Sequence, residues 1–200
     1  MNPLIARMSP TATRMIRMDH AHVMSQYHKL QPDTSASVRE ATIRNICTAL
    51  EIHATLEEEI FYPALREVAA DNPVLAESVS EHDEMRSLIA TVRGMGSDDP
   101  GMEDAMGALM RAVLHHVADE EAVLLPLAER QMGSRLAELG AQMTARRFEL
   151  AKPHAGQMAV DLARASPAKA TLMVVGTLAA AGALMLGSSR RARRATLIDG

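Results

Sequence analysis

The sequence predicts an all-α protein: an up-down-up-down four-helix bundle with a C-terminal helical extension and a transmembrane helix. Three observations lead to this fold class. Apolar residues recur at three- and four-residue spacing along most of the chain. No segment alternates Val, Ile, Thr and aromatic residues as a strand would, and no Asn-Gly or Asp-Gly hairpin occurs. Short loops join the helical segments, and such loops favour antiparallel neighbours.

Residues that interrupt helices set the expected boundaries. The bundle helices are expected at residues 11–30, 37–68, 74–93 and 102–131. The second is expected to bend or end near Pro63, and Pro73 suits the first turn of the third. The glycine-rich segment 94–101 is a loop. We therefore expect a bundle domain at 11–131, a helix at 134–151 and linker within 132–169, a membrane helix at 170–189 and a basic tail at 190–200.

The amino-acid composition limits which partners and which cellular compartment we expect. The net charge of −4, with two Phe, two Tyr and no Trp, offers neither a basic surface nor a stacking platform, so we expect no nucleic acid partner. Cys47 is the only cysteine, which precludes an intrachain disulfide. The first residues lack the apolar core of a signal peptide. We therefore expect a cytoplasmic bundle.

Each bundle helix carries a histidine on its apolar face. His20 shares the stripe of Ile16 and Val23, and His82 lies on the stripe of the third helix. On the other two helices a glutamate follows the histidine by four residues. The remaining stripe residues are Tyr27, Leu30, Ile46, Leu50, Ile60, Leu75, Val79, Ile89, Val92, Met106, Leu109, Val113, Val123 and Leu127, with His53, Glu57, His116 and Glu120 among them.

Carboxylates on apolar faces need a partner. Burying an ionised carboxylate costs several kcal/mol unless it is paired or bound to a metal. Residues four apart on a helix project side by side, so His53 with Glu57 and His116 with Glu120 each aim an imidazole and a carboxylate at one point. Adding His20 and His82 makes six side chains, enough to hold two metal ions, as in the dimetal carboxylate bundles but with the His and Glu order reversed.

An internal repeat supports the same arrangement. His116, Glu120 and Pro126 each follow their counterparts His53, Glu57 and Pro63 by 63 residues, and His82 follows His20 by 62. Two similar halves packed about a pseudo-two-fold axis would create two similar metal positions.

At these motifs the chain resembles the hemerythrin-like HHE cation-binding domains, over about residues 12 to 130. The matching segments are Asp19 to Val23, His53 to Pro63, Glu81 to Asp83, and His115 to Glu121 with Pro126. The resemblance implies a non-haem di-iron centre bridged by the two carboxylates, with ligands His20, His53, Glu57, His82, His116 and Glu120. Oxygen-carrying hemerythrins have another histidine where this chain has Arg86, which implies an open coordination position and argues against simple oxygen carriage.

Other polar residues receive simpler interpretations. His115 is expected behind the ligands or on the surface, because His116 fits the stripe. Surface positions are expected for His22, His28 and His154, and solvated or salt-bridged ones for Glu58, Glu59 and Glu121. Tyr62 is open between a hydrogen-bond donor near the metals and a packing residue. Cys47 is interpreted as an unreactive core thiol. Imidazole and carboxylate suit iron, zinc, manganese or nickel, and iron comes from the resemblance.

The C-terminal segment predicts membrane contact. Residues 170–187 are 18 uncharged and mostly apolar residues, followed by four arginines within residues 190–194. We expect a membrane anchor at 170–189 rather than a soluble docking helix or an interfacial one. The arginines favour the cytoplasmic side, which conflicts with a cytoplasmic bundle lacking an export signal.

Three functions follow from the ligand set. The first is a non-haem di-iron protein that binds or senses dioxygen, nitric oxide or iron. The alternative is a di-iron enzyme that acts on peroxide or repairs damaged iron centres. The third is a structural bundle in which the six residues form a metal-free polar network, although a half-satisfied buried network is worse than an apolar core. The expected partner is a small diatomic ligand or peroxide, and the oligomeric state is left open.

Overall fold

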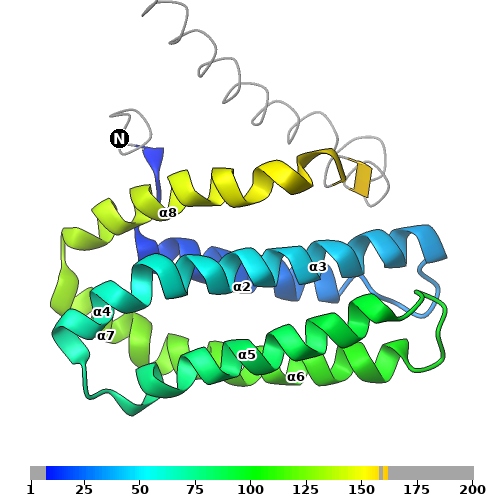
Figure 1. Cartoon of the computed structure of the whole chain (residues 1–200), viewed down its shortest axis with the longest axis horizontal. Helices are drawn as coiled ribbons and strands as arrows, with labels where there is room; N and C mark the ends of the chain where they lie inside the picture. The colour runs from blue at the N-terminus through cyan, green and yellow to red at the C-terminus, as the bar shows by residue number, and fades with distance from the viewer. Residues whose placement is uncertain (1–7, 158–159, 162–200) are drawn as a thin grey trace, which may run out of the picture.

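The computed structural model describes residues 8–157, 160 and 161, and every regular element among them is a helix (Figure 1). The first bundle helix is α2 (Ala12–Tyr27). The second is α3 (Ala36–Leu56), which runs through the π-helical turn η1 (Glu57–Phe61) into α4 (Tyr62–Ala69). The third is α5 (Pro73–Gly94). The fourth is α6 (Met102–Asp119), which continues through η2 (Glu120–Leu124) into α7 (Leu125–Met132).

These helices form the expected bundle. α2 packs against α3 and α5 against α6, with the long helices side by side (Figure 1). The helix starts follow local chemistry: the Thr11 hydroxyl accepts from the Arg14 N–H at 3.4 Å, and the Asn72 side chain accepts from the Leu75 N–H at 3.2 Å. Pro73 occupies the first turn of α5, where its missing N–H costs nothing. The helix expected at 11–30 ends earlier, at Tyr27.

A fifth helix, α8 (Arg135–Ala151), lies over α2 and α3 rather than standing apart from the bundle (Figure 1). It begins after Gly133, whose φ of 48° turns the chain back. At Gly140 the helix touches the start of α2, and a Cβ there would lie 2.0 Å from the Pro10 carbonyl oxygen. A glycine is therefore required at this crossing. A 3₁₀ turn (Lys152–His154) follows α8.

The two prolines act on the turns that precede them. Pro63 does not end the second helix, since α4 continues it to Ala69. Instead the turn before each proline widens: Tyr62 N–H bonds to the Glu57 carbonyl and Leu125 N–H to the Glu120 carbonyl. Proline lacks an N–H and its ring crowds the carbonyl four residues earlier, which favours such a π-turn.

Because of the π-turns, the apolar stripes predicted beyond each glutamate are not the buried faces of the helices. An extra residue in one turn rotates the following face by about 100°. As a result Ile60, Val123 and Leu127, expected on the stripes, are only half-buried. The residues that fill the core there are Phe61, Tyr62, Leu124 and Leu125, all fully buried.

Two apolar clusters make up the core, with the polar residues between them along the bundle. One includes Ile16, Leu56 and Leu75. The other includes Val23, Leu50 and Ile89, together with the buried Cys47, whose pKa is raised to about 11 by burial. The histidines of α2 and α3 fall between members of the two clusters, so apolar packing holds the polar centre from both sides.

The predicted membrane helix at 170–189 and the basic tail lie outside the described residues. Within the part of the chain that the structure describes, no helix is both long and apolar enough to cross a bilayer.

Candidate metal centre

The six residues singled out from the sequence lie together in the middle of the bundle. All are buried, and His82, Glu57 and Glu120 have no exposed surface. One histidine comes from each bundle helix, and the two glutamates stand at the first position of each π-turn. The side chains are His20, His53, Glu57, His82, His116 and Glu120.

The Nε2 atoms of all four histidines point inward at the two carboxylates. The His20 Nε2 lies 3.3 Å from Glu120 Oε2. Those of His53 and His82 lie 3.2 Å and 3.3 Å from Glu57 Oε2. The Nε2 of His116 lies 3.5 Å from Glu120 Oε2 and 3.9 Å from Glu57 Oε2. Each glutamate therefore faces more than one imidazole.

The Nδ1 atoms point outward, and each faces a carboxylate from another helix. The distances are 2.9 Å from His20 to Glu121, 3.6 Å from His53 to Asp19, 2.8 Å from His82 to Glu58, and 2.8 Å from His116 to Glu81. An Nδ1–H that donates to a carboxylate leaves the Nε2 lone pair free, which is the tautomer that binds a metal at Nε2.

These outer contacts form a closed ring around the bundle. The first helix supplies Asp19 to the histidine of the second, and the second supplies Glu58 to that of the third. The third supplies Glu81 to the fourth, and the fourth supplies Glu121 back to His20. Each outer carboxylate adjoins an inner ligand in sequence, so one turn of each helix serves both functions.

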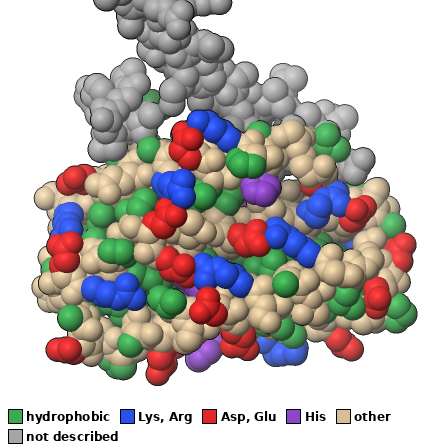
Figure 2. Space-filling model, viewed as in Figure 1, with side chains coloured by type: hydrophobic (Ala, Val, Ile, Leu, Met, Phe, Trp, Pro, Cys, Tyr) green, Lys and Arg blue, Asp and Glu red, His purple; other side chains and the backbone are tan. Residues whose placement is uncertain are grey.

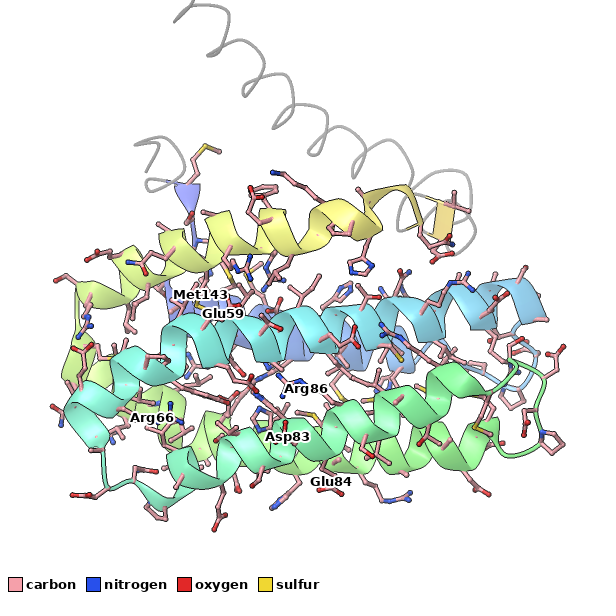
Figure 3. All side chains as sticks on the ribbon, viewed as in Figure 1. Glu59, Arg66, Asp83, Glu84, Arg86 and Met143 are labelled. Atoms are coloured by element: carbon pink, nitrogen blue, oxygen red, sulfur yellow. The ribbon has the colours of Figure 1, made fainter. Side chains whose placement is uncertain are left out.

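Arginines hold two of the outer carboxylates from outside. Arg147, on α8, pairs with Asp19. Arg86 donates to Glu58 at 2.7 Å and to Asp83 at 3.0 Å, and Figure 3 shows it beside Asp83. The Arg86 side chain is 36% exposed and holds Glu58, the carboxylate that contacts the His82 Nδ1, from the surface.

The Tyr62 hydroxyl joins the cluster and breaks its two-fold repeat. It lies 3.2 Å from Glu57 Oε2 and 3.0 Å from Glu120 Oε1, and 3.5 Å from the His82 Nε2. The equivalent position in the second half, 63 residues later, is Leu125. Burial first, and then the charges of the two glutamates, raise the pKa of Tyr62. The phenol therefore stays protonated, and its O–H donates a hydrogen bond to the carboxylates.

Without an ion, the surroundings favour an ionised Glu57 and protonated His116 and His20. Burial opposes ionisation of Glu57, but His53, His116 and His82 hold its pKa well below the usual range. Burial also disfavours a charged His116, yet Glu57, Glu120 and Glu81 raise its pKa to about 9. The pKa of His20 is raised against the same burial, chiefly by Glu120.

Several buried atoms still lack a hydrogen-bond partner among the described residues: His20 Nε2, Glu57 Oε1 and Glu120 Oε2. Two sets of ligand atoms converge within 4.8 Å: His53, Glu57, His82 and His116 form one, and His20, His53, Glu57 and Glu120 form the other. The sets share His53 and Glu57. Because orphaned buried acceptors are costly and imidazole with carboxylate suits transition metals, this donor set fits metal ions.

A small cavity of about 10 Å³ opens beside the cluster. Three of the histidines and Asp19 form its polar side. Its apolar side consists of Val23, Leu50, Met85, Val113 and Val117. That space is roughly the size of one water molecule and is too small for an organic substrate.

The sequence interpretation missed the outer ring. Glu58 is salt-bridged to Arg86, as expected, but the contacts of Glu58 with His82 and of Glu121 with His20 were not predicted. Asp19 and Glu81 had received no function. The signal was present as an acidic residue next to four of the six inner residues. His115 lies on the surface as expected, and Tyr62 has the hydrogen-bonding role, one of its two alternatives.

Comparisons with known proteins agree on the type of domain. The sequence pattern of the hemerythrin HHE cation binding domain matches residues 11–128. A DNA nickase from Nostoc sp. (strain PCC 7120 / SAG 25.82 / UTEX 2576) is 28% identical over 124 residues, which are 62% of this chain and 35% of the relative. The chain therefore spans about a third of that protein's length.

A solved structure has a similar fold. It is that of a hemerythrin HHE cation binding domain-containing protein, the Rv2633c homolog from Mycobacterium kansasii. Its TM-score is 0.63 at 22% identity, and the match covers 78% of this chain and 99% of that one.

Proposed function

The chain belongs to the hemerythrin HHE cation-binding domain family, and we propose that it is a non-haem di-iron protein that binds or senses dioxygen, nitric oxide or iron. The observation that carries the proposal is the convergence of six buried metal-ligating side chains whose inner atoms lack sufficient partners. Iron is the family's metal, and zinc or manganese would suit the same donors.

The residues of the cluster would have different roles in holding the metal ions. His82 and His116 would serve one ion and His20 with Glu120 the other, with His53 and Glu57 common to both sets. Hydrogen bonds to Glu121, Glu58 and Glu81 would hold His20, His82 and His116 in the ligating tautomer, and Asp19 faces the His53 Nδ1 at 3.6 Å. A bound pair of iron ions would supply reversible binding of a small diatomic molecule. The apolar wall formed by Val23, Leu50 and Val113 would admit such a molecule while limiting water.

The first test is metal analysis of the purified chain. We expect about two iron ions per chain, as in other dimetal carboxylate bundles, and a large loss in His116→Ala. His28→Ala, an exposed histidine at the end of α2, is the matched control and should retain the metal. A chain that holds no metal, or equal iron in both variants, would refute the proposal.

The second test addresses the ligand. The iron-loaded chain should change its visible absorption on exposure to dioxygen or nitric oxide. An iron-loaded sample whose spectrum responds to neither gas would exclude binding or sensing of dioxygen and nitric oxide, and would leave iron sensing and catalysis as the remaining functions.

The alternative is an enzyme that acts on peroxide or repairs iron centres. Arg86 pairs with Glu58 and Asp83 and would not act as a ligand, which would leave a coordination position open, and the Tyr62 O–H would serve as a hydrogen-bond donor within the cluster. Peroxide consumption by iron-loaded wild type, compared with His116→Ala, tests this. Equal rates would exclude catalysis at this centre.

We propose no nucleic acid partner, although a relative is described as a DNA nickase. The net charge is −4. On the face in Figure 2, basic and acidic side chains are interspersed, with no continuous basic surface.

A further inference from the structure

A second group of metal-ligating side chains lies on the surface, next to the buried cluster. His115 and Asp119 stand one turn apart on α6, and Glu81 faces them from α5. One ligand atom from each lies within 4.8 Å of the others. An imidazole and a carboxylate four residues apart on a helix project side by side and can share one ion.

An arginine neutralises two of the outer carboxylates, and Glu81 is not one of them. Asp19 and Glu58 each pair with an arginine, Arg147 and Arg86. Glu121 forms no ion pair with lysine or arginine among the described residues, since the nearby Arg17 pairs with Glu129. Over the described ranges, neither Glu81 nor Asp119 forms an ion pair with lysine or arginine. The outer neighbour of Glu81 is His115, whose Nε2 lies 3.7 Å from Oε1, beyond hydrogen-bond length.

We propose that Glu81, His115 and Asp119 bind a third, divalent transition-metal cation at the surface. One imidazole and two carboxylates suit zinc, ferrous iron or manganese. The His115 side chain is 71% exposed, whereas that of Glu81 is 15% exposed. The ion would thus be anchored on its inner side by Glu81 and would keep positions open to water, as an exchangeable site does.

Glu81 connects this site to the buried cluster. Its Oε1 faces His115, and its Oε2 accepts from the His116 Nδ1 at 2.8 Å. A cation on Oε1 withdraws negative charge from the carboxylate, which weakens its support of His116. This coupling rests on the proposed function, because it needs His116 to be a ligand; the surface site itself does not.

The experiment uses the full chain, loaded with iron and then dialysed against Zn²⁺, with both metals measured. Wild type should bind one zinc per chain beyond any that replaces iron. His115→Ala and Asp119→Asn should lose that zinc, with at least about a tenfold weaker affinity, and keep their iron. His28→Ala should behave as wild type.

A third variant separates the two claims. Glu81→Gln should lose the surface zinc and also hold iron about 10- to 100-fold less tightly, since it removes the support of His116. Equal zinc binding by wild type, His115→Ala and Asp119→Asn would overturn the surface site. If the zinc difference persists in a chain that never holds iron, the proposed function fails and the surface site stands. Unchanged iron affinity in Glu81→Gln would overturn the coupling.

Discussion

His82 and His116 place their Nε2 atoms 3.1 Å apart in the middle of the bundle. Both rings direct Nδ1 at a carboxylate 2.8 Å away, so both would present Nε2 lone pairs to each other. Two facing lone pairs repel unless a proton or a metal ion lies between them or beside them. Because these two nitrogens lie so close together, the cluster requires a proton or a metal ion beside them.

The protonation of His116 predicts that the stability of the metal-free chain depends on pH. In the metal-free chain the pKa of His116 is raised to about 9 by Glu57, Glu120 and Glu81, against the effect of burial. A raised pKa means that the folded state binds the proton more tightly than the unfolded state, in which it leaves near pH 6.5. The stabilisation is complete below that value and is lost as the pH rises through about 9.

We therefore expect the melting temperature of the metal-free chain to fall between pH 6.5 and pH 9.5. The metal-loaded chain should not show this fall, because an ion replaces the proton. Thermal unfolding across this range measures both. Parallel curves for the two forms would contradict the expectation.

The arginine pair on α8 offers a test of the outer ring. Arg147→Met should lower iron affinity by about 10- to 100-fold, because Asp19 loses the partner that fixes it against His53. Arg146→Met is the adjacent control: Arg146 pairs with exposed Glu59, which touches none of the six ligands (Figure 3 labels Glu59). Competition with a chelator measures the affinities, and equal losses in the two variants would show a general effect of α8.

Removing one oxygen at Tyr62 tests the asymmetry of the centre. Tyr62→Phe leaves the ring in its buried site but deprives Glu57 and Glu120 of a donor. Denaturant unfolding of the metal-free variant should show a loss of about 1–3 kcal/mol. Tyr27→Phe, at the half-buried end of α2, should change stability far less.

Metal content of Tyr62→Phe separates two roles. We expect iron binding to persist, because the hydroxyl is not one of the six ligands. If Tyr62→Phe loses iron as completely as His116→Ala, the phenol is part of the binding site itself.

The crossing of α8 over α2 predicts a steric effect. In Gly140→Ala the new Cβ would meet the backbone of Pro10 and Ala12, at 2.0 Å and 2.9 Å, so the helix must move away. We expect a loss of about 1–3 kcal/mol and weaker iron binding, since α8 carries Arg147. Gly156→Ala, with nothing within 4 Å, is the control. A Gly140→Ala chain as stable as wild type would show that the crossing yields easily.

Much of the bundle could be predicted because helical periodicity is local. The apolar stripes, the breaks before Pro73 and after Gly94, and the matched His-x-x-x-Glu segments are visible in the residues alone. The prediction was wrong beyond each glutamate. Ile60 and Val123 were expected in the core, but Phe61 and Leu124 are the buried residues there. A regular helical period does not show where a π-turn adds a residue. Pro63 was interpreted as a bend or an end of its helix, and Pro126 as part of the internal repeat.

The six inner residues came from the sequence because each sits as a polar residue on an apolar face, a contrast that needs no knowledge of neighbours. The ring of Asp19, Glu58, Glu81 and Glu121 came only from the tertiary structure, because each carboxylate serves a histidine on a different helix. The helix at 134–151 was predicted, but its packing over α2 and α3 came only from the tertiary structure. The spacing of apolar residues along one helix shows which of its side chains are buried. A contact between two helices depends on the angle and register at which they pack.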